Sequence, residues 1–216
     1  MIKIHQDNTH FTLTGIKNCP YLNKIFISIK EINLFPFTFI DNNNLHFHAQ
    51  TVEFLDDYKN NETFLKYDEI LFVLYSISSQ IYNLEQMGFT FFGFDIKDIL
   101  VINKKYFFII NPSKLVSINN KNLITFLKPF QKPYFSSPEM LNLNELPMSL
   151  NFKSIYYSLG SLLVYCMFQE YILKGNDFKN MDEIEKILVP IYKTKLYWCL
   201  KRCLEIKIEN RFLLFI

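Results

Sequence analysis

The stretch Gly88–Ser113, GFTFFGFDIKDILVINKKYFFIINPS, decides how the rest of the chain is organised. A helical pattern leads into it, and a short turn region, Gly88–Asp98, follows. Two apolar segments then flank a Lys104-Lys105 turn, which predicts a β-hairpin that ends in the tripeptide Asn111–Ser113. A loop and a strand end arranged in this way aim two sets of polar side chains at one point. We expect any chemistry of this protein to lie there.

Composition limits the class of protein before any motif is considered. A chain of 216 residues that is 50% hydrophobic can bury one sizeable core, or one domain with a small appended lobe. The net charge of +2 implies no electrostatic partner. Arg202 and Arg211 are the only arginines, and most aromatic side chains lie in apolar runs, so no nucleic-acid partner is expected.

Cysteine usage and hydropathy indicate a cytoplasmic chain without a membrane segment. The four cysteines show no metal-ligand spacing, and Cys199 and Cys203, four residues apart on a helical pattern, suggest a buried apolar pair. No secretory leader pattern opens the sequence, so reduced thiols are expected. The longest apolar run, residues 155–168, is too short to span a bilayer and predicts a buried core helix.

Residues 1–55 predict a β-rich region without a helix. An Asn42–Asn44 turn signal suggests an antiparallel hairpin, and the polar residues 56–61 are expected to link this region to the rest. The strands are expected at His10–Leu13, Lys24–Ile32, Phe35–Ile40 and Leu45–Phe54.

From Tyr67 the hydrophobic period changes to three and four residues, which predicts an amphipathic helix ending before Gly88. Beyond the Gly88–Ser113 stretch, residues 115–118 and 123–126 suggest a further hairpin, and three prolines then mark an irregular segment. The fold class is therefore α+β, with a β-rich N-terminal lobe (1–55) and a mainly helical region (56–216). Its later helices are expected at Phe152–Phe168, Met181–Leu188 and Ile191–Glu205.

The Gly88–Ser113 stretch resembles the catalytic region of a serine/threonine protein kinase. Kinases carry Gly-x-x-His-Arg-Asp-x-x-x-x-Asn-Ile-Leu, a strand pair and then Asp-Phe-Gly. Without a gap, Gly88 takes the first glycine, Asp98 takes the asparagine and Asn111–Ser113 takes Asp-Phe-Gly. The resemblance implies a kinase-like fold with a reduced N-terminal lobe.

Later motifs extend the resemblance over about 150 residues, in the order that kinases have them. Ser137–Glu139 is similar to Ala-Pro-Glu, Tyr157–Gly160 to Trp-Ser-Leu-Gly, and Cys203-Leu204 followed by Arg211 to the end of the kinase domain. The resemblance implies an ion pair between Glu139 and Arg211. The abundance of Asn, Lys, Ile and Phe suggests an AT-rich genome, so kinase-like proteins of large AT-rich DNA viruses are the expected relatives, with the host cytoplasm as location.

The same register removes the catalytic base. The base position is Gly93, which has no side chain, and the preceding His and Arg positions are Phe91 and Phe92. The aspartate of the central helix that supports this loop in kinases falls at Ile155. A polar anchor and its polar loop have become apolar together, so we expect packing to hold the loop, with Phe91 in the hydrophobic core.

The two metal positions have exchanged side-chain types. Asp98 takes the asparagine position and Asn111 the aspartate position. Hard cations accept carboxylate oxygens and amide oxygens as ligands. A weak Mg²⁺ site at these residues is one interpretation, with Asp95 as a displaced base or a third oxygen ligand. The alternative is that Asp95 and Asp98 are solvated or loop-capping carboxylates and Asn111 is a turn residue.

The N-terminal lobe offers little for nucleotide binding. No Gly-x-Gly-x-x-Gly occurs, and Gly15 is the only glycine before Gly88. Ile27–Lys30 resembles the Val-Ala-Ile-Lys of the phosphate-binding strand, which makes Lys30 the candidate cofactor-binding residue. The alternative is an exposed strand lysine.

Three hypotheses follow. The leading one is a pseudokinase that binds a protein partner, transfers no phosphate and needs no cofactor. The second is a divergent serine/threonine kinase that binds ATP and Mg²⁺ and uses Asp95 or Asp98 as the base. The third is an unrelated α+β protein whose resemblance to kinases is accidental. A structure without a buried helix at Phe152–Phe168, or with Glu139 far from Arg211, would favour this hypothesis.

Overall fold

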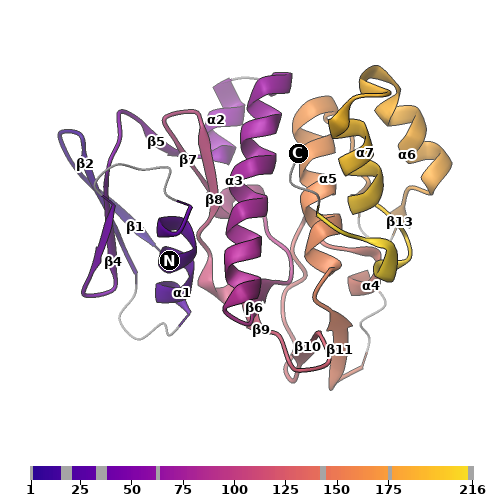
Figure 1. Cartoon of the computed structure of the whole chain (residues 1–216), viewed down its shortest axis with the longest axis horizontal. Helices are drawn as coiled ribbons and strands as arrows, with labels where there is room; N and C mark the ends of the chain where they lie inside the picture. Colours follow the sequence, from indigo (N-terminus) through magenta and orange to yellow (C-terminus); the bar gives the residue numbers. More distant parts are fainter. Residues whose placement is uncertain are drawn as a thin grey trace.

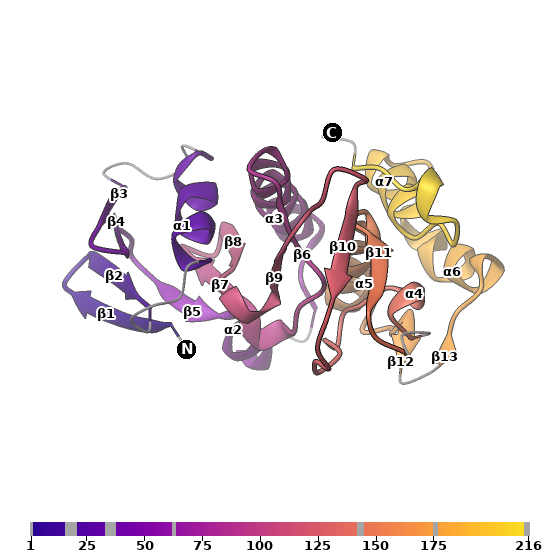
Figure 2. The ribbon, with the colours of Figure 1, turned by 90° about the horizontal axis from the view of Figure 1, so that it is seen from below.

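The computed structural model confirms an α+β chain. A small antiparallel sheet with one helix lies at one end, the long helix α3 (Tyr67–Gln86) lies in the middle, and the helices α5 to α7 lie at the other end (Figures 1 and 2). The structure describes residues 2–15, 21–32, 38–61, 64–141, 145–174 and 177–213.

The N-terminal sheet has four antiparallel strands in the order β1-β2-β4-β3. Its side chains alternate between two faces, and Phe11, Leu13, Leu45 and Phe47 fill the buried face. An Asn42–Asn43 turn with positive φ at both residues joins the last two strands, as expected. The strands are β1 (Lys3–Asp7), β2 (His10–Thr14), β3 (Phe39–Asp41) and β4 (Asn44–His48).

The expectation that residues 1–55 lack a helix is wrong. The predicted strand Lys24–Ile32 is a helix, α1 (Leu22–Lys30). Its isoleucines favour a strand by propensity, but Leu22, Ile25, Phe26 and Ile29 recur at helical spacing and are all buried. Burying this stripe against α3 and the N-terminal sheet outweighs the local β preference.

Other expectations in this region change in detail. The predicted strand Leu45–Phe54 is two strands, β4 and β5 (Val52–Phe54), and β5 pairs with β7 in a different sheet. The polar link at 56–61 is a helix, α2 (Leu55–Asn61). The first part of the predicted strand Phe35–Ile40 lies outside the described residues.

The expected central helix and hairpin are both present. Strands β7 (Ile99–Ile102) and β8 (Tyr106–Ile109) pair antiparallel and pack on α3. The buried Gln80 of α3 donates from Nε2 to the carbonyl oxygen of Ile109 and accepts from its N–H, both at 2.8 Å. The Gln80 amide thus pairs with the backbone N–H and carbonyl of Ile109 at the edge of β8, where another strand could otherwise bind.

The expected hairpin at 115–118 and 123–126 is wrong, because its two strands find other partners. Strand β9 (Leu115–Ser117) pairs with β6 (Phe89–Phe91), inside the region expected to be a turn. Strand β10 (Leu123–Phe126) pairs with β11 (Met148–Asn151). Both partners are distant in sequence, so local turn signals did not reveal them.

The C-terminal helices agree with the sequence. Helix α5 (Ser154–Phe168) is buried along most of its length, and Gly160 lets α7 (Lys195–Cys203) approach, since an added Cβ would lie 3.0 Å from Leu204. Cys199 and Cys203 are both buried. None of the described helices is long and apolar enough to cross a bilayer. The remaining elements are α4 (Pro138–Leu141), β12 (Leu173–Lys174), β13 (Asp177–Phe178) and α6 (Met181–Leu188).

One carboxyl lies in the contact between α3 and α5. Glu85 of α3 accepts a 3.0 Å hydrogen bond at Oε2 from the hydroxyl of Tyr156, while its buried Oε1 has no hydrogen-bond partner. Burial raises the pKa of Glu85 from its ordinary 4.5 to about 7, and the Tyr156 hydroxyl and the charge of Lys153 oppose this rise.

We expect Glu85→Gln to remove a pH dependence of stability. Below pH 4.5 the Glu85 carboxyl is protonated in the folded and in the unfolded chain. Between pH 4.5 and 7 only the folded chain keeps this proton. The free energy of unfolding should fall by on the order of 3 kcal/mol across this window and stay low above it. Urea unfolding at several pH values measures this, with the exposed Glu31→Gln as control. A slope unchanged by Glu85→Gln would contradict the assignment.

Candidate functional site

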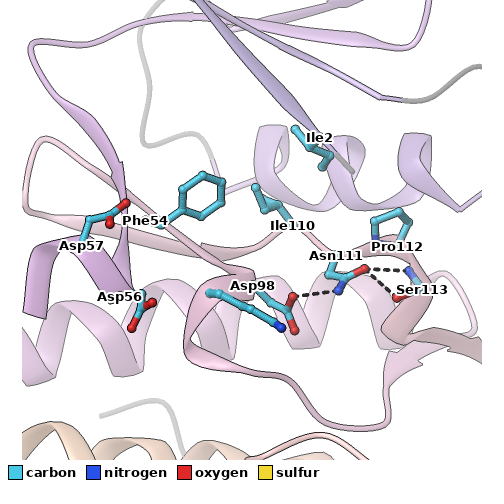
Figure 3. Close-up of a pocket in the computed structure, with 10 residues that line it drawn as sticks. Ile2, Phe54, Asp56, Asp57, Asp98, Ile110, Asn111, Pro112 and Ser113 are labelled. Carbon is cyan, nitrogen blue, oxygen red and sulfur yellow. Dashed lines mark hydrogen bonds between the residues drawn. The ribbon is translucent and has the colours of Figure 1, made fainter. Parts of the chain in front are cut away.

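A cavity of about 590 Å³ lies where the Asp98 loop and the strand end at Asn111 meet (Figure 3). Ile2, Phe54 and Ile110 provide an apolar wall. The polar side chains come from α2, from the loop before β7 and from the residues after β8: Asp56, Asp57, Lys97, Asp98, Asn111 and Ser113.

The Asp98 and Asn111 side chains bind each other. Asn111 donates from Nδ2 to Asp98 Oδ1 at 2.7 Å, and Asp98 Oδ2 accepts from the N–H of Asp95 at 2.9 Å. Asn111 Oδ1 accepts from the N–H and the hydroxyl of Ser113, at 3.1 and 2.7 Å. Asp98 is only 6% exposed. The four terminal atoms of the two side chains all have protein partners, and a metal ion would have to replace some of them.

Asp95 is a structural side chain in this arrangement. Its Oδ1 accepts from the N–H of Tyr134 at 2.7 Å, and its Oδ2 lies 3.5 Å from the ammonium of Lys114. The carboxylate therefore ties the loop before β7 to the segment before α4. A base needs an oxygen directed at a substrate hydroxyl, and both oxygens of Asp95 are already engaged.

Gly93 has no room for a side chain. Its φ is +144°, and an added Cβ would lie 2.7 Å from the carbonyl oxygen of Phe135 and 2.8 Å from Cγ of Pro133. The neighbouring Phe94 makes an isolated β-bridge with Phe135. The loop and the segment before α4 are in contact at the position where the resemblance places the base.

The two phenylalanines before Gly93 belong to different clusters. Phe91 is fully buried in the main core, as expected, and Ile155 is buried in the same core. Phe92 belongs to a second cluster with Ile124, Phe126, Met140 and Leu150. Its ring centre lies 5.4 Å from that of Phe126 and 5.0 Å from that of Phe130. Aromatic packing therefore fixes the segment between β9 and α4 to the loop.

Lys30 does not lie on a strand. It is the last residue of α1 and its side chain is exposed. It is not among the residues that line the cavity. Its expected place on a phosphate-binding strand is wrong, for the same reason that the strand itself is a helix.

Glu139 and Arg211 form a bidentate ion pair 72 residues apart in sequence. Arg211 Nη1 lies 2.6 Å from Glu139 Oε1 and Nη2 lies 3.1 Å from Oε2. Arg211 is fully buried, and it also donates to the carbonyl oxygens of Glu205 and Ile206. Its guanidinium carbon lies 4.9 Å from the ring centre of Tyr157. Four hydrogen bonds and this ring compensate the buried charge.

Sequence reasoning missed two features of the site. It treated residues 56–61 as a link, yet Asp56 and Asp57 line the cavity. It also did not find Lys114, which is 8% exposed and lies beside Asp95. The adjacent carboxylates of Asp56 and Asp57, at the start of a polar segment, were a signal for the first feature. No sequence signal pointed to Lys114.

Neither a metal-ligand cluster nor a known relative identifies the function of this site. Within the described ranges, no group of three or more His, Cys, Asp or Glu side chains is arranged to hold a metal ion. The chain matches no protein-family model and no curated protein sequence. The geometry of the residues themselves therefore carries the functional argument.

We expect Gly93→Asp to destabilise the fold rather than restore a base. The new side chain would meet the Phe135 carbonyl and also adopt an unfavourable φ, for a loss of about 3–5 kcal/mol. Gly88→Asp is the matched control, since φ is +77° and nothing lies within 4 Å of an added Cβ, so about 1–2 kcal/mol is expected. Urea unfolding measures both. Equal losses would show that the contact with Phe135 is unimportant.

We expect Glu139→Gln to cost about 3 kcal/mol of unfolding free energy, because it leaves the buried Arg211 without its countercharge. The partly exposed pair Lys201–Glu185, at 2.5 Å, provides the comparison, and Glu185→Gln should cost less than about 1 kcal/mol. Similar losses for the two variants in the same unfolding assay would argue against a structural role for Glu139.

Proposed function

We propose that this chain is a pseudokinase: a degenerate protein-kinase-like protein that acts by binding a protein partner and transfers no phosphate. The observation that carries the proposal is that the base position, Gly93, is closed by Phe135, while Asp98 and Asn111 at the metal positions bind each other. In this proposal the chain keeps the arrangement of elements around a phosphotransferase site. The residues at its catalytic positions make structural contacts instead.

The order and contacts of the elements support the kinase-like frame. A sheet with one helix is followed by α3, a loop, the β7–β8 hairpin, a proline-containing segment and the buried α5. Glu139 after the segment contacts Arg211 after α7, as the kinase resemblance implies. An absent α5, or a Glu139 far from Arg211, would have favoured the hypothesis of an unrelated α+β protein. The structure contains α5 and the Glu139–Arg211 pair, so neither observation supports that alternative.

The groups that position a nucleotide in kinases have no counterpart in the described N-terminal lobe. Kinases use a glycine-rich loop and an ion pair between a strand lysine and a helix glutamate. Strand β2, which precedes α1, contains no lysine, and α1 contains no glutamate. The cavity adds the carboxylates of Asp56, Asp57 and Asp98 against the single ammonium of Lys97. This charge repels a triphosphate.

The segment before α4 supports a constant binding surface. In regulated kinases, phosphorylation orders this segment through arginine contacts. Here the arginine position is Phe92, and stacking of Phe126 on Phe130, with centres 4.3 Å apart, joins Phe92 in fixing the segment. Leu127 on this segment is 74% exposed. A surface that is ordered without modification suits a permanent interaction role.

The second candidate function is a divergent serine/threonine kinase that retains ATP and Mg²⁺ binding. The cavity of about 590 Å³ favours it, since this volume is within the range of small-ligand sites. Asp98 and Asn111 would hold the ion after exchanging their mutual hydrogen bond for metal contacts.

Nucleotide-dependent melting separates the two candidates. For the pseudokinase we expect no change in Tm with millimolar ATP and Mg²⁺, and no transfer of labelled γ-phosphate to the chain or to a generic protein substrate. A site filled at 100 times its dissociation constant would stabilise the fold by about 2.7 kcal/mol, which a melting curve resolves.

The control is Asp98→Ala, tested alongside Glu31→Ala on the exposed end of α1. A nucleotide-induced Tm shift together with phosphate transfer, both lost in Asp98→Ala and kept in Glu31→Ala, would establish the divergent kinase and reject the pseudokinase.

A further inference from the structure

Helix α7 has an outer face that is not part of the core. The helix lies at the end of the molecule opposite the N-terminal sheet (Figure 1). Its buried residues, among them Leu196 and Leu200, lie on the inner side. The residues of the outer side recur at three- and four-residue spacing: Lys195, Trp198, Lys201 and Arg202. Trp198 is the only tryptophan of the chain and is 47% exposed, and the motifs of the kinase resemblance give it no role.

The turn before α7 adds two exposed apolar side chains to this face. Val189 and Tyr192 are 64% and 57% exposed, and they lie in and directly after the 3-10 turn Val189–Ile191. The ring centre of the buried Tyr197 is 5.2 Å from that of Tyr192 and 5.0 Å from that of Trp198. Tyr197 therefore connects the two exposed rings into one surface. Large apolar side chains that are exposed together and surrounded by polar groups are typical of a contact site.

The charges around these side chains are mostly positive. From Lys186 to Arg202 the sequence has five basic and no acidic residues, although the whole chain carries only +2. Glu185 of α6 contributes one carboxylate, which lies 2.5 Å from the ammonium of Lys201. The other three lysines of this segment, Lys186, Lys193 and Lys195, form no ion pair with a described residue. Positive charge that is not neutralised within the chain remains next to the apolar side chains.

Lysine side chains lie over both exposed rings. Lys193 Nζ is 5.6 Å from the ring centre of Tyr192, and Lys201 Nζ is 5.9 Å from that of Trp198. These cation–π contacts keep the ammonium groups at the rings. A molecule that covers the rings must therefore also contact the ammonium groups.

We propose that this α7 surface, formed by Val189, Tyr192, Lys193, Lys195 and Trp198, docks an acidic segment of a protein partner. Carboxylates of the segment would face the lysines, and an apolar side chain of the segment would cover the rings. Such charge complementarity raises the association rate and the selectivity of a complex. The inference rests on the proposed partner-binding function and adds the chemistry of the partner.

The apolar side chains favour a protein over a lipid bilayer as the occupant. A helix that lies in a bilayer interface exposes a continuous apolar side. Helices α6 and α7 instead bury theirs, with Ile184 and Leu188 on α6 and Leu196 and Leu200 on α7. Tryptophan and tyrosine are the side chains enriched at the energetic centres of protein interfaces. A second copy of the chain is disfavoured as well, because a two-fold contact would bring the lysines of both copies together.

Trp198 allows a direct test, because the fluorescence of the only tryptophan reports on this surface. The full chain is titrated, without nucleotide, with a random copolymer of glutamate and leucine. We expect a saturable change in tryptophan emission and a dissociation constant that increases with salt concentration. Polyglutamate of the same length should bind more weakly, since it lacks the apolar side chains. Tyr192→Ala should reduce the difference between the two polymers.

Charge reversal locates the binding site. The double variant Lys193→Glu/Lys195→Glu keeps the reporter and should weaken copolymer binding by at least about tenfold. The matched control is Lys104→Glu/Lys105→Glu in the β7–β8 turn, which changes the net charge equally and should bind as the parent chain does. Lys104 resembles Lys193, since their φ angles are +55° and +64° and their ammonium groups lie 5.7 and 5.6 Å from a tyrosine ring centre. Circular dichroism verifies that each variant is folded.

The proposal is overturned if the copolymer leaves the tryptophan emission unchanged up to millimolar glutamate, or if the two double variants bind it equally. It is also overturned if phosphatidylserine vesicles bind more tightly than the copolymer, which would assign the surface to a membrane. A tryptophan emission that depends on protein concentration alone would assign it to a second copy and overturn the proposal too. The pseudokinase is tested separately by nucleotide-dependent melting and phosphate transfer, so failure here is distinguishable from failure of that proposal.

Discussion

The carboxylate of Asp98 is the contact on which the centre of the molecule depends. One oxygen holds the amide of Asn111 and the other holds the N–H of Asp95, while the Asp98 carbonyl accepts from the N–H of Ile110. A loop and a strand end 13 residues apart are thereby locked together at the floor of the cavity. Because Asp98 is almost fully buried, loss of any of these partners would leave a polar group unsatisfied.

Around this contact, packing replaces polar chemistry. Where the kinase resemblance places a base, an arginine and a supporting aspartate, the chain has Gly93, Phe92 and Ile155. Gly93 admits the backbone of Phe135, Phe92 holds the aromatic cluster of the following segment, and Ile155 fills the core. These exchanges are mutually consistent, since an apolar loop packs on an apolar support and the missing side chain of Gly93 permits the close approach of Phe135. The ion pair Glu139–Arg211 keeps its charge because four hydrogen bonds and the Tyr157 ring surround the guanidinium.

The cavity and the outer face of the N-terminal sheet carry different kinds of polar side chain. The cavity gathers carboxylates, with Asp56, Asp57 and Asp98 against Lys97. The outer face of the N-terminal sheet gathers imidazoles, with His10 in contact with His46 and His48. His46 and His48 share one side of β4, and the pairing of β2 with β4 brings His10 to them.

The sequence by itself determined the elements whose signals are local. The periodicity of α3, the apolar run of α5 and the turn between β7 and β8 could all be read from the order of apolar and polar residues, because each element buries its own apolar side chains. The burial of Phe91 was expected from the register of the kinase resemblance. The approach of Glu139 to Arg211 could be anticipated only through the spacing of motifs.

Tertiary structure alone decided the rest. Residues 22–30 form a helix because their apolar stripe packs on α3 and the N-terminal sheet. Strands β9 and β10 pair with strands distant in sequence instead of with each other. It also decided that Asp95 pairs with Lys114 and the Tyr134 backbone instead of facing a substrate, and that Gly93 lies against Phe135. The role of a side chain depends on the groups that contact it in the folded chain. Here those groups come from segments that no local sequence pattern connects.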